Sequence, residues 1–292
     1  MNPRARRWLP WISAAIILAL SVGFVSWRLG TQLITPANHE VELPATLSLT
    51  TVAIPGPGYT IAGSWRDLGP DTPAVLLLHG VRGDRASMAP RARLLGEAGF
   101  SVLLIDLQAH GETPGDMITA GWRESADVRA ARDWLRARAP GRKLAVIGVS
   151  LGGAAVLLGD QPAGFDAVVL EAVYPRIGRA IENRIGIRAG ALKYLLAPLL
   201  VAQIEPRMHI AVEDLEPIRH IGALGAPVLV VGGSRDAHTT EEETRALYSA
   251  AADPKLLWIV EGAAHQDFSR FDPAGYQAHV AGFLREWLSR RD

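Results

Sequence analysis

Six short apolar runs, separated by segments of helical periodicity, restrict this chain to an architecture that alternates strands and helices. The runs are residues 74–78, 101–105, 144–149, 167–170, 227–231 and 256–260. Most of them show no alternation of polar and apolar residues, which is typical of strands covered by helices on both faces. Right-handed crossovers between such strands predict a mostly parallel, doubly wound α/β sheet.

The segments between these runs carry helix signals of three kinds. Val128, Ala131 and Leu135 share one helical face, and Thr240 with Glu243 forms a predicted capping box. An apolar stripe at helical spacing predicts a last helix; it consists of Tyr276, Val280, Phe283, Leu284, Trp287 and Leu288. Ahead of the sheet, residues 46–65 predict a hairpin that turns at residues 55–58, Pro-Gly-Pro-Gly.

Residues 174–225 interrupt the alternation, because they have helical character and no strand-like run. Within them residues 191–203, ALKYLLAPLLVAQ, are unusually apolar for a surface excursion. Two interpretations stay open. The segment is either a helical insertion that packs its own small core, or a cap over the active site with some leucines facing substrate or lipid.

The N-terminus contains a second apolar feature. Arg4, Arg6 and Arg7 precede the uncharged stretch from Trp8 to Trp27, whose 20 residues span roughly 30 Å as a helix, the thickness of a bilayer core. Tryptophans near both ends suit the two membrane interfaces. Arginines on the N-terminal side predict that this end stays in the cytoplasm, so that the catalytic domain lies outside it, on the periplasmic side in a Gram-negative cell.

These features divide the chain into an anchor at residues 1–30, a polar linker at 31–45 and one catalytic α/β domain at 46–292. A cleaved signal peptide is the main alternative to an uncleaved anchor, although its apolar core is normally shorter and Ser21-Val22-Gly23 is a poor cleavage site. A buried helix of a soluble protein is the third interpretation.

Composition limits the function classes. Apolar residues make up 49% of the chain and charged residues 21%, which argues against disorder. Thirty basic residues balance thirty acidic ones, so no basic surface predicts nucleic-acid binding. The chain has no cysteine, which excludes disulfides, a cysteine nucleophile and thiolate metal sites.

The pentapeptide Gly148-Val149-Ser150-Leu151-Gly152 carries the clearest chemical signal. It follows an apolar strand and precedes the helix-forming residues 154–158. A serine on such a sharp strand-to-helix turn exposes its hydroxyl, and the flanking glycines let strand and helix pass closely. We therefore predict Ser150 as a nucleophile.

A serine nucleophile needs a base, and His265 is the best placed of the eight histidines. It follows the last strand-like run and precedes the final helix. His238 is too close to the predicted acid, whereas His39 lies in the linker. His209, His220 and His279 fall in or beside helical segments.

The acid that orients the base should lie between nucleophile and base in chain order. Asp236 directly follows the run 227–231 and reaches the same sheet edge, where it would fix the tautomer of His265. A helix-capping role is the alternative for Asp236, and Glu171 is the reserve candidate for the acid.

An oxyanion hole needs two preorganised N–H donors. The backbone N–H of Leu151 is the first, because it directly follows the nucleophile. Val81 is predicted to supply the second, since Gly80 lets the chain turn inward after the run 74–78, and Arg82 is the weaker alternative. His79 is interpreted as a hydrogen-bonding group that holds this loop.

No cofactor or metal is predicted. The chain contains no phosphate-binding loop and no dinucleotide fingerprint after the first parallel strand. Asp106, Gln108, His110 and Glu112 all lie on one loop, with no second ligand cluster of suitable spacing.

These motifs together resemble the α/β-hydrolase superfamily from about residue 46 to the C-terminus. The segments that carry the resemblance are LLLHGVRGDRASM, LLIDLQAHGET, VIGVSLGG, VVGGSRD and EGAAHQDF. The chain is similar to the membrane-anchored bacterial branch, and to serine aminopeptidase-like and lysophospholipase-like members. The resemblance implies a triad of Ser150, Asp236 and His265, an oxyanion hole at Val81 and Leu151, acyl-enzyme chemistry and no cofactor.

One departure concerns the loop after residue 106, where Gln108-Ala109-His110-Gly111 replaces the Arg-Gly-His-Gly of many relatives. This loop is a scaffold element in the family, so the departure bears on subfamily. Substrate does not follow from the fold.

The predicted function is hydrolysis of carboxylic esters through an acyl-enzyme on Ser150, with small-molecule or lipid-like acyl substrates. Amide or peptide hydrolysis and thioester hydrolysis remain open. A membrane-tethered binding protein with a vestigial triad is the alternative from another class, and a perhydrolase side activity is a further one. The sequence leaves the oligomeric state open.

Overall fold

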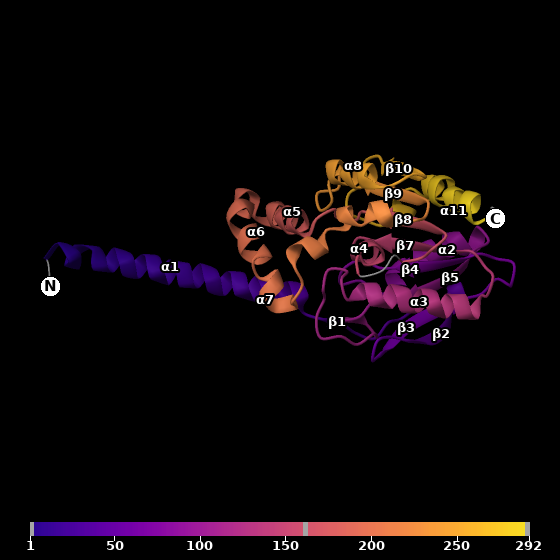
Figure 1. The fold of residues 1–292 in the computed structure, drawn as a ribbon, viewed down its shortest axis with the longest axis horizontal. Coiled ribbons are helices and arrows are strands. Elements are labelled where there is room, and N and C mark those ends of the chain that lie inside the picture. Colours follow the sequence, from indigo (N-terminus) through magenta and orange to yellow (C-terminus); the bar gives the residue numbers. More distant parts are fainter. Residues whose placement is uncertain (1–2, 160–162, 290–292) are drawn as a thin grey trace.

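The computed structural model describes residues 3–159 and 163–289, and within them the core is a mostly parallel sheet of eight strands (Figure 1). Residues 1–2 of the predicted anchor and 290–292 of the predicted catalytic domain lie outside the described residues. The strand order is β10-β9-β8-β7-β4-β5-β3-β2. The bounds are β2 Thr50–Pro55, β3 Thr60–Arg66, β4 Ala74–Leu78, β5 Ser101–Ile105, β7 Leu144–Val149, β8 Ala167–Glu171, β9 Val228–Gly233 and β10 Lys255–Val260.

From β5 across to β10 every neighbouring pair of strands is parallel. The hairpin predicted at residues 46–65 is β2 and β3, which run antiparallel and extend the sheet beyond β5. The fold predicted from the alternation of apolar runs is confirmed. Three of those runs coincide with β4, β5 and β7 because fully apolar runs of this length have no other place than the centre of a sheet.

Helices cover both faces of the sheet. One face, with Leu76 and Val146 among its residues, packs against α3 Glu124–Arg138, α4 Leu151–Leu157 and α8 Glu241–Ala250. The other face packs against α2 Ala89–Glu97, α9 Phe268–Phe271, α10 Pro273–Tyr276 and α11 Gly282–Leu288. Successive strand residues point to opposite faces, so each strand contributes to both cores.

Two helix predictions have specific outcomes. Thr240 caps α8, and Glu243 returns a bond to the Thr240 backbone, so the predicted capping box is confirmed. The predicted last helix is not one regular helix, because a wider turn over Gln277–Ala281 separates α10 from α11. Its apolar stripe nevertheless packs on the sheet as predicted.

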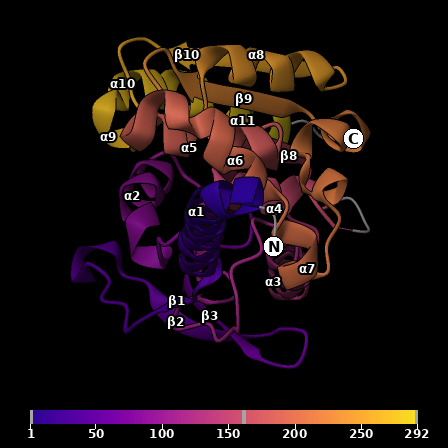
Figure 2. The same cartoon turned by 90° about the vertical axis from the view of Figure 1, so that its left-hand side faces the viewer.

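The segment 174–225 forms a helical layer beside the carboxyl end of the sheet (Figure 2). It holds α5 Ile177–Ala189, α6 Lys193–Val201 and α7 Ile204–Met208, followed by short 3₁₀ turns, and its described residues contain no strand. The helices α5 and α6 contact each other across a turn at Gly190, whose φ is 55°. We call α5 to α7 the cap.

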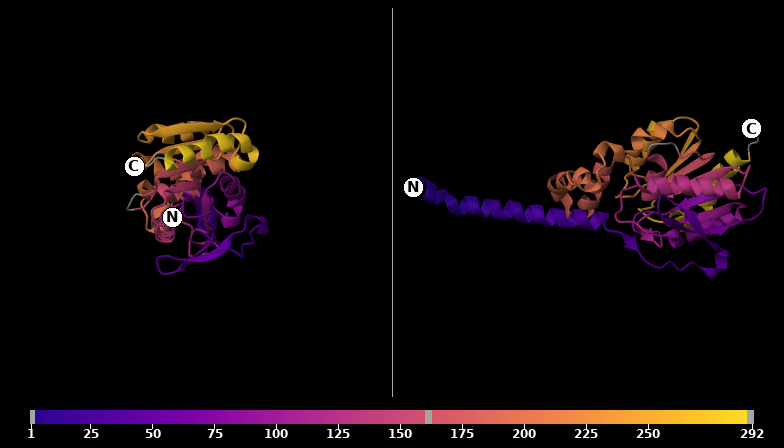
Figure 3. Two further views of the ribbon diagram at one scale, coloured as in Figure 1. Left: turned by 90° about the vertical axis from the view of Figure 1, so that its right-hand side faces the viewer. Right: turned by 60° about the horizontal axis from the view of Figure 1, so that its bottom comes forward.

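The N-terminal residues form one long helix, α1 Pro3–Ile34, which projects away from the rest of the fold (Figure 3). It extends past residue 30, the predicted end of the anchor, because Gly30 stays helical. Two described helical stretches are long and apolar enough to cross a membrane by length and composition, Trp11–Ile34 and Ile177–Met208. The second is the cap, which the turn at Gly190 divides into a bent pair of packed helices.

The residues predicted as a linker are bound to the body of the protein. The short strand β1 Ala37–Asn38 pairs in parallel with β6 His110–Gly111, a contact that no sequence pattern predicted. Asn38 Nδ2 donates a hydrogen bond to the Thr113 carbonyl at 2.7 Å. The stretch after α1 is therefore held along the loop that follows β5.

Candidate active site

Ser150 lies between β7 and α4 in a backbone conformation that residues with a side chain rarely adopt. Its φ is 49° and its ψ is −109°. A non-glycine residue at positive φ is strained, and such strain collects at functional sites when the surroundings hold it in place. In this turn the Ser150 N–H donates to the Glu171 carbonyl at 2.8 Å, which fastens the turn to β8.

Glycines on both sides of Ser150 are required by close packing. A Cβ on Gly148 would lie 2.5 Å from the Cα of Gly153, and one on Gly152 would lie 2.7 Å from the carbonyl oxygens of Leu78 and His79. Both distances are far below normal contact. The structure thus gives the glycines the steric role inferred from the sequence, and α4 approaches the end of β4 closely.

His265 and Asp236 are brought together by the two loops that follow β10 and β9. The His265 Nδ1–H donates to Asp236 Oδ2 at 2.7 Å. Asp236 Oδ1 accepts from the N–H groups of His238, at 2.7 Å, and Thr239, at 2.9 Å. The carboxylate is buried and fully oriented, so it holds His265 in the tautomer whose Nε2 can accept a proton.

Glu171, the reserve candidate for the acid, is engaged elsewhere. Its Oε2 accepts from Arg91 Nη2 at 2.6 Å, and its Oε1 accepts from the Tyr276 hydroxyl at 2.7 Å. Burial disfavours the charge on Arg91, but Glu171 more than offsets it and raises the pKa of Arg91 above its ordinary value. Glu171 therefore holds α2 and α10 against the sheet, and Asp236 is the carboxylate that His265 contacts.

His238 packs beside His265, with ring centroids 4.9 Å apart. Burial, with a smaller contribution from His265, lowers the pKa of His238 below its ordinary value of 6.5. A neutral His238 does not oppose positive charge on its neighbour. This packing of His238 against His265 has no signal in the sequence, from which His238 is considered only as an alternative base.

A cavity of about 350 Å³ opens over the carboxyl end of the sheet. Its lining includes Val81, Arg91, Ser150, Arg184, His265 and Gln266. No hydrogen bond joins Ser150 Oγ to His265 within the described part of the chain, and such bonds are often long before substrate arrives. The cavity lies where parallel-sheet proteins bind ligands, beside β4, where the direction of winding reverses. The chain passes from β4 to β5 on one side and then from β5 back across β4 to β7 on the other.

Of the two predicted oxyanion donors, Val81 lines the same cavity, and Leu151 directly follows Ser150, which also lines it. Leu151 is the first residue of α4, and the first N–H groups of a helix have no acceptor within the helix. Val81 follows Gly80, whose Cα faces Ser150 closely enough that an added Cβ would lie 3.6 Å from the serine Cβ. Arg82, the weaker alternative, turns its side chain outward and donates to the Gln32 carbonyl at the end of α1.

Buried polar contacts of His79 hold the loop that carries Val81. His79 donates from Nδ1 to the Gly80 carbonyl at 2.8 Å and accepts at Nε2 from the Leu107 N–H at 3.0 Å. Burial lowers the pKa of His79 to about 3, so the ring is neutral at neutral pH. The interpretation of His79 as a group that holds the loop is confirmed.

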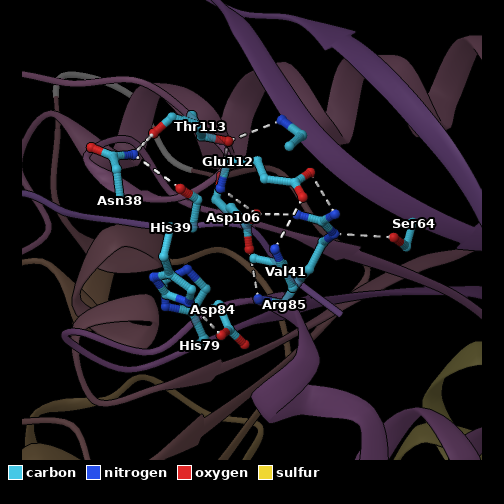
Figure 4. Close-up of polar contacts among 12 residues, drawn as sticks. Asn38, His39, Val41, Ser64, His79, Asp84, Arg85, Asp106, Glu112 and Thr113 are labelled. Carbon is cyan, nitrogen blue, oxygen red and sulfur yellow. Dashed lines mark hydrogen bonds and ion pairs between the residues drawn. The ribbon is translucent and has the colours of Figure 1, made fainter. Parts of the chain in front are cut away.

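The other part of this network joins the loop after β4 to the loop after β5 (Figure 4). Asp106 forms a buried ion pair with Arg85 and accepts from the Glu112 N–H at 2.9 Å. Arg85 Nη2 also contacts Glu112 Oε2 at 2.7 Å. These three side chains form a scaffold, and His39 joins it from the stretch after α1 through Asp84 at 2.9 Å.

Two arginines in the cavity had no signal in the sequence, Arg91 and Arg184. Each lies in a helix of ordinary composition, and only the tertiary structure places it in the lining of the cavity that also contains Ser150. The glycines, strand ends and chain order that identify Ser150, Asp236 and His265 give no information about such side chains.

Known proteins share sequence with most of this chain. The family model described as serine aminopeptidase, S33, matches residues 69–216. The uncharacterized protein Rv2307c of Mycobacterium tuberculosis is 30% identical over 98% of both chains. The uncharacterized protein YqkD of Bacillus subtilis is 24% identical, with 94% of this chain and 92% of that protein covered.

Solved structures share the fold. The Pyrococcus furiosus esterase Pf2001 superposes with a TM-score of 0.72 at 22% identity, over 88% of this chain and 98% of that one. A puromycin-hydrolyzing peptidase of Mycobacterium tuberculosis gives a TM-score of 0.63 at 20% identity, over 83% of this chain and 40% of the other. By its family match and by its full-length relative, the chain belongs to the serine aminopeptidase S33 family of α/β-hydrolases.

Proposed function

We propose that the protein hydrolyses carboxylic esters through an acyl-enzyme on Ser150. The observation that carries this proposal is the set of contacts around one cavity. Asp236 orients His265 by a 2.7 Å hydrogen bond, and His265 borders the same cavity as the strained Ser150. An activated serine needs a base within reach and a third group that orients the base.

The chemistry follows from these positions. His265 Nε2 takes the proton of Ser150 as the serine oxygen forms a bond to the acyl carbon. The N–H groups of Val81 and Leu151 hold the oxyanion, and the bond to the alcohol oxygen breaks as His265 returns the proton to that oxygen. Water then attacks the acyl-enzyme by the same route, which releases the acid and restores Ser150.

The substrate class is proposed to be lipid-like or long-chain acyl esters. The cap region exposes Leu192, Tyr194 and Leu195, with 57%, 71% and 58% of their surface accessible. These residues lie in or beside α6, which contacts α1. An exposed apolar surface beside a helix long enough to cross a bilayer favours a substrate delivered from the lipid phase.

Amide or peptide hydrolysis is the second candidate, and the family description favours it because it names an aminopeptidase. Both activities use the same serine, so they are separated by substrate. The test compares kcat/KM for an ester and for an amide that carry the same acyl group. Their leaving groups differ only in the atom bonded to the carbonyl, oxygen in one and nitrogen in the other. Faster turnover of the amide would replace the ester proposal while keeping Ser150 as nucleophile.

A tagged fluorophosphonate tests the proposal directly, because it reacts only with an activated serine. Wild-type protein should be labelled at Ser150 and hydrolyse long-chain acyl esters. Ser150→Ala should lose labelling and lower kcat by about a million-fold. Ser87→Ala is the matched control, since Ser87 borders the same cavity but donates to the Asp84 carbonyl, and it should retain labelling. Unlabelled, correctly folded wild-type protein would favour a non-catalytic binding protein instead.

A further inference from the structure

Arg184 is a cation of the cavity that lacks an anionic partner among the described residues. Its side chain borders the cavity together with Ser150 and His265. Within residues 3–159 and 163–289, no carboxylate forms an ion pair with it and no hydrogen bond satisfies its guanidinium. The other arginine of the cavity, Arg91, is already neutralised by Glu171 at 2.6 Å and Asp267 at 3.0 Å.

Three other cations in and beside the cap have carboxylate partners. Arg179 contacts Glu182 at 2.8 Å, and Lys193 contacts the same carboxylate at 3.3 Å. Arg176 lies 3.6 Å from Glu216. Carboxylates of the cap and of the segment after it thus pair with these three cations, whereas no carboxylate of the described residues forms an ion pair with Arg184 in the lining of the cavity.

The position of Arg184 is fixed by its neighbour in α5. Asn183 is buried, and its Nδ2 donates to Glu243 Oε2 at 2.8 Å and to the His238 carbonyl at 3.1 Å. These bonds attach α5 to the loop that carries Asp236 and to the first turn of α8. Arg184 is therefore presented to the cavity from a helix that is locked to the loop of the proposed acid.

The electrostatic surroundings of Arg184 favour an anion. Asp236 lies close enough to act on it electrostatically, but both oxygens of that carboxylate are already hydrogen-bonded. Arg188, one turn further along α5, adds positive potential and is exposed. A partly buried guanidinium attracts an anion more strongly than an exposed one, and its planar fork matches a carboxylate or phosphate with two parallel hydrogen bonds.

We propose that Arg184 is an anion-binding subsite, and that the preferred substrate is an ester carrying a carboxylate or a phosphate a few bonds from the scissile carbonyl. This inference rests on the proposed ester hydrolysis, which it narrows to anionic esters. It also fits a lipid-like substrate with a charged head group, since the apolar part would face the cap and the charged part would bind the guanidinium.

Paired substrates that differ only in charge test this subsite. One pair is the p-nitrophenyl monoester of glutaric acid and its neutral carboxamide, which places a carboxylate on the acyl side. The second pair is 1-octanoylglycerol 3-phosphate and 1-octanoylglycerol, which places a phosphate on the alcohol side. Wild-type protein should prefer the anionic member of at least one pair by about 10-fold or more in kcat/KM, mainly through a lower KM.

Variants of α5 assign the preference to one side chain. Arg184→Met should abolish the preference, measured as the ratio of kcat/KM for the anionic and the neutral member of each pair. Arg184→Lys should keep part of it, because an ammonium retains the charge but not the fork. Arg188→Met is the matched control on the same helix and should keep most of the preference.

The outcomes separate this inference from the proposed function. The subsite is overturned if wild-type protein hydrolyses neutral and anionic esters at equal rates, or if the preference survives in Arg184→Met. Either result leaves the proposed ester hydrolysis unaffected. Absence of hydrolysis of every ester, with no fluorophosphonate labelling, overturns the proposed function itself. The pair that shows the preference identifies the anion as carboxylate or phosphate.

Discussion

Asp236 accepts hydrogen bonds on both of its oxygens, so replacing it by asparagine separates orientation from charge. In Asp236→Asn the amide oxygen can still accept from His238 and Thr239, but the amide nitrogen then faces His265 Nδ1. This arrangement favours the tautomer with a protonated Nε2, which cannot act as a base. We expect kcat to fall by about 10⁴-fold with little change in melting temperature, measured by ester hydrolysis and thermal unfolding.

Glu171→Gln serves as the control, because Glu171 binds Arg91 and Tyr276 instead of His265. It should lower the melting temperature, since the buried Arg91 loses one of its two carboxylate partners, yet activity per folded molecule should stay within a fewfold. A larger loss of kcat in Glu171→Gln than in Asp236→Asn would contradict the assignment of the acid.

His79 links the pH dependence of stability to the loop that carries Val81. Burial lowers the pKa of His79 from 6.5 to about 3 in the folded protein. Between these values the unfolded chain binds a proton that the folded protein does not bind. The free energy of unfolding therefore decreases as the pH falls below about 6.5, by about 2 kcal/mol at pH 5.

His79→Gln removes this titration while keeping an acceptor for the Leu107 N–H. Urea unfolding between pH 7 and pH 4.5 should show a shallower loss of stability for the variant than for the wild type. Other buried groups titrate in both proteins, so only the difference between them is interpreted. Parallel pH profiles would show that the pKa of His79 is the same in the folded and unfolded states.

At the scale of residues, the sequence predicted the positions that backbone geometry requires. A serine between glycines, an aspartate after the fifth parallel strand and a histidine after the last one can be located from chain order alone. Arg184 and His238 could not be found in this way, because their roles depend on how α5 and the loop after β9 pack in three dimensions.

At the scale of elements, the contact between α4 and β4 makes Gly152 a sensitive glycine of the turn at Ser150. In Gly152→Ala the new methyl group would lie 2.7 Å from two carbonyl oxygens, so α4 must move and Leu151 with it. We expect the free energy of unfolding to fall by about 1–3 kcal/mol, and kcat to fall by about 100-fold. Urea unfolding and ester hydrolysis measure the two effects.

Gly282→Ala is the matched control in α11, where nothing lies within 4 Å of the added methyl group. Its free energy of unfolding should rise by about 0.5–1 kcal/mol, because alanine favours a helix more than glycine does. If the two variants had equal unfolding curves and equal kcat, α4 would have room for a methyl group at position 152, contrary to the packing described above.

The central strands were the most predictable elements of the fold. Buried parallel strands have continuous apolar runs, whereas β1 and β6 are two residues each and depend only on backbone pairing between distant segments. The break at Gln277–Ala281 was also invisible, since the apolar stripe continues through it. Patterns of side chains predict burial well and backbone irregularity poorly.

The chain as a whole offers a clean test of membrane insertion, because it contains no cysteine. With α1 as an uncleaved anchor, the protein should resist extraction by alkaline carbonate. A single cysteine replacing Glu242, which is exposed on α8, should react with an impermeant maleimide from outside protoplasts or spheroplasts. If the N-terminus lies in the cytoplasm, as the flanking arginines predict, a cysteine replacing Asn2 should react only after lysis.

Other results of the extraction and labelling experiments would indicate a different processing or orientation of the N-terminus. Extraction by carbonate together with a shortened chain would indicate a cleaved signal peptide, and labelling of position 2 from outside would reverse the orientation. Neither result would affect Ser150, Asp236 and His265, whose geometry does not depend on α1.

Side chains of the cap and of a loop near the cavity bind the C-terminal end of α1. Gln203 Nε2 donates to Ser26 Oγ at 2.8 Å, Arg207 Nη1 donates to Thr31 Oγ1 at 3.0 Å, and the Arg207 guanidinium stacks on the Trp27 ring at 3.6 Å. Arg82, next to Val81, binds carbonyls at the last turn of the helix. The helix and the catalytic domain are therefore joined without a free tether.

This direct attachment of α1 to the catalytic domain determines the kinetics that the enzyme would follow in a bilayer. A hydrolase on a long flexible linker can reach substrates in the surrounding solution. A hydrolase held at a fixed distance from the bilayer reaches only substrates in the adjacent lipid leaflet. Its encounters become two-dimensional, so turnover would follow the mole fraction of substrate in the membrane and would fall when inert lipid dilutes that substrate, even at a constant bulk concentration.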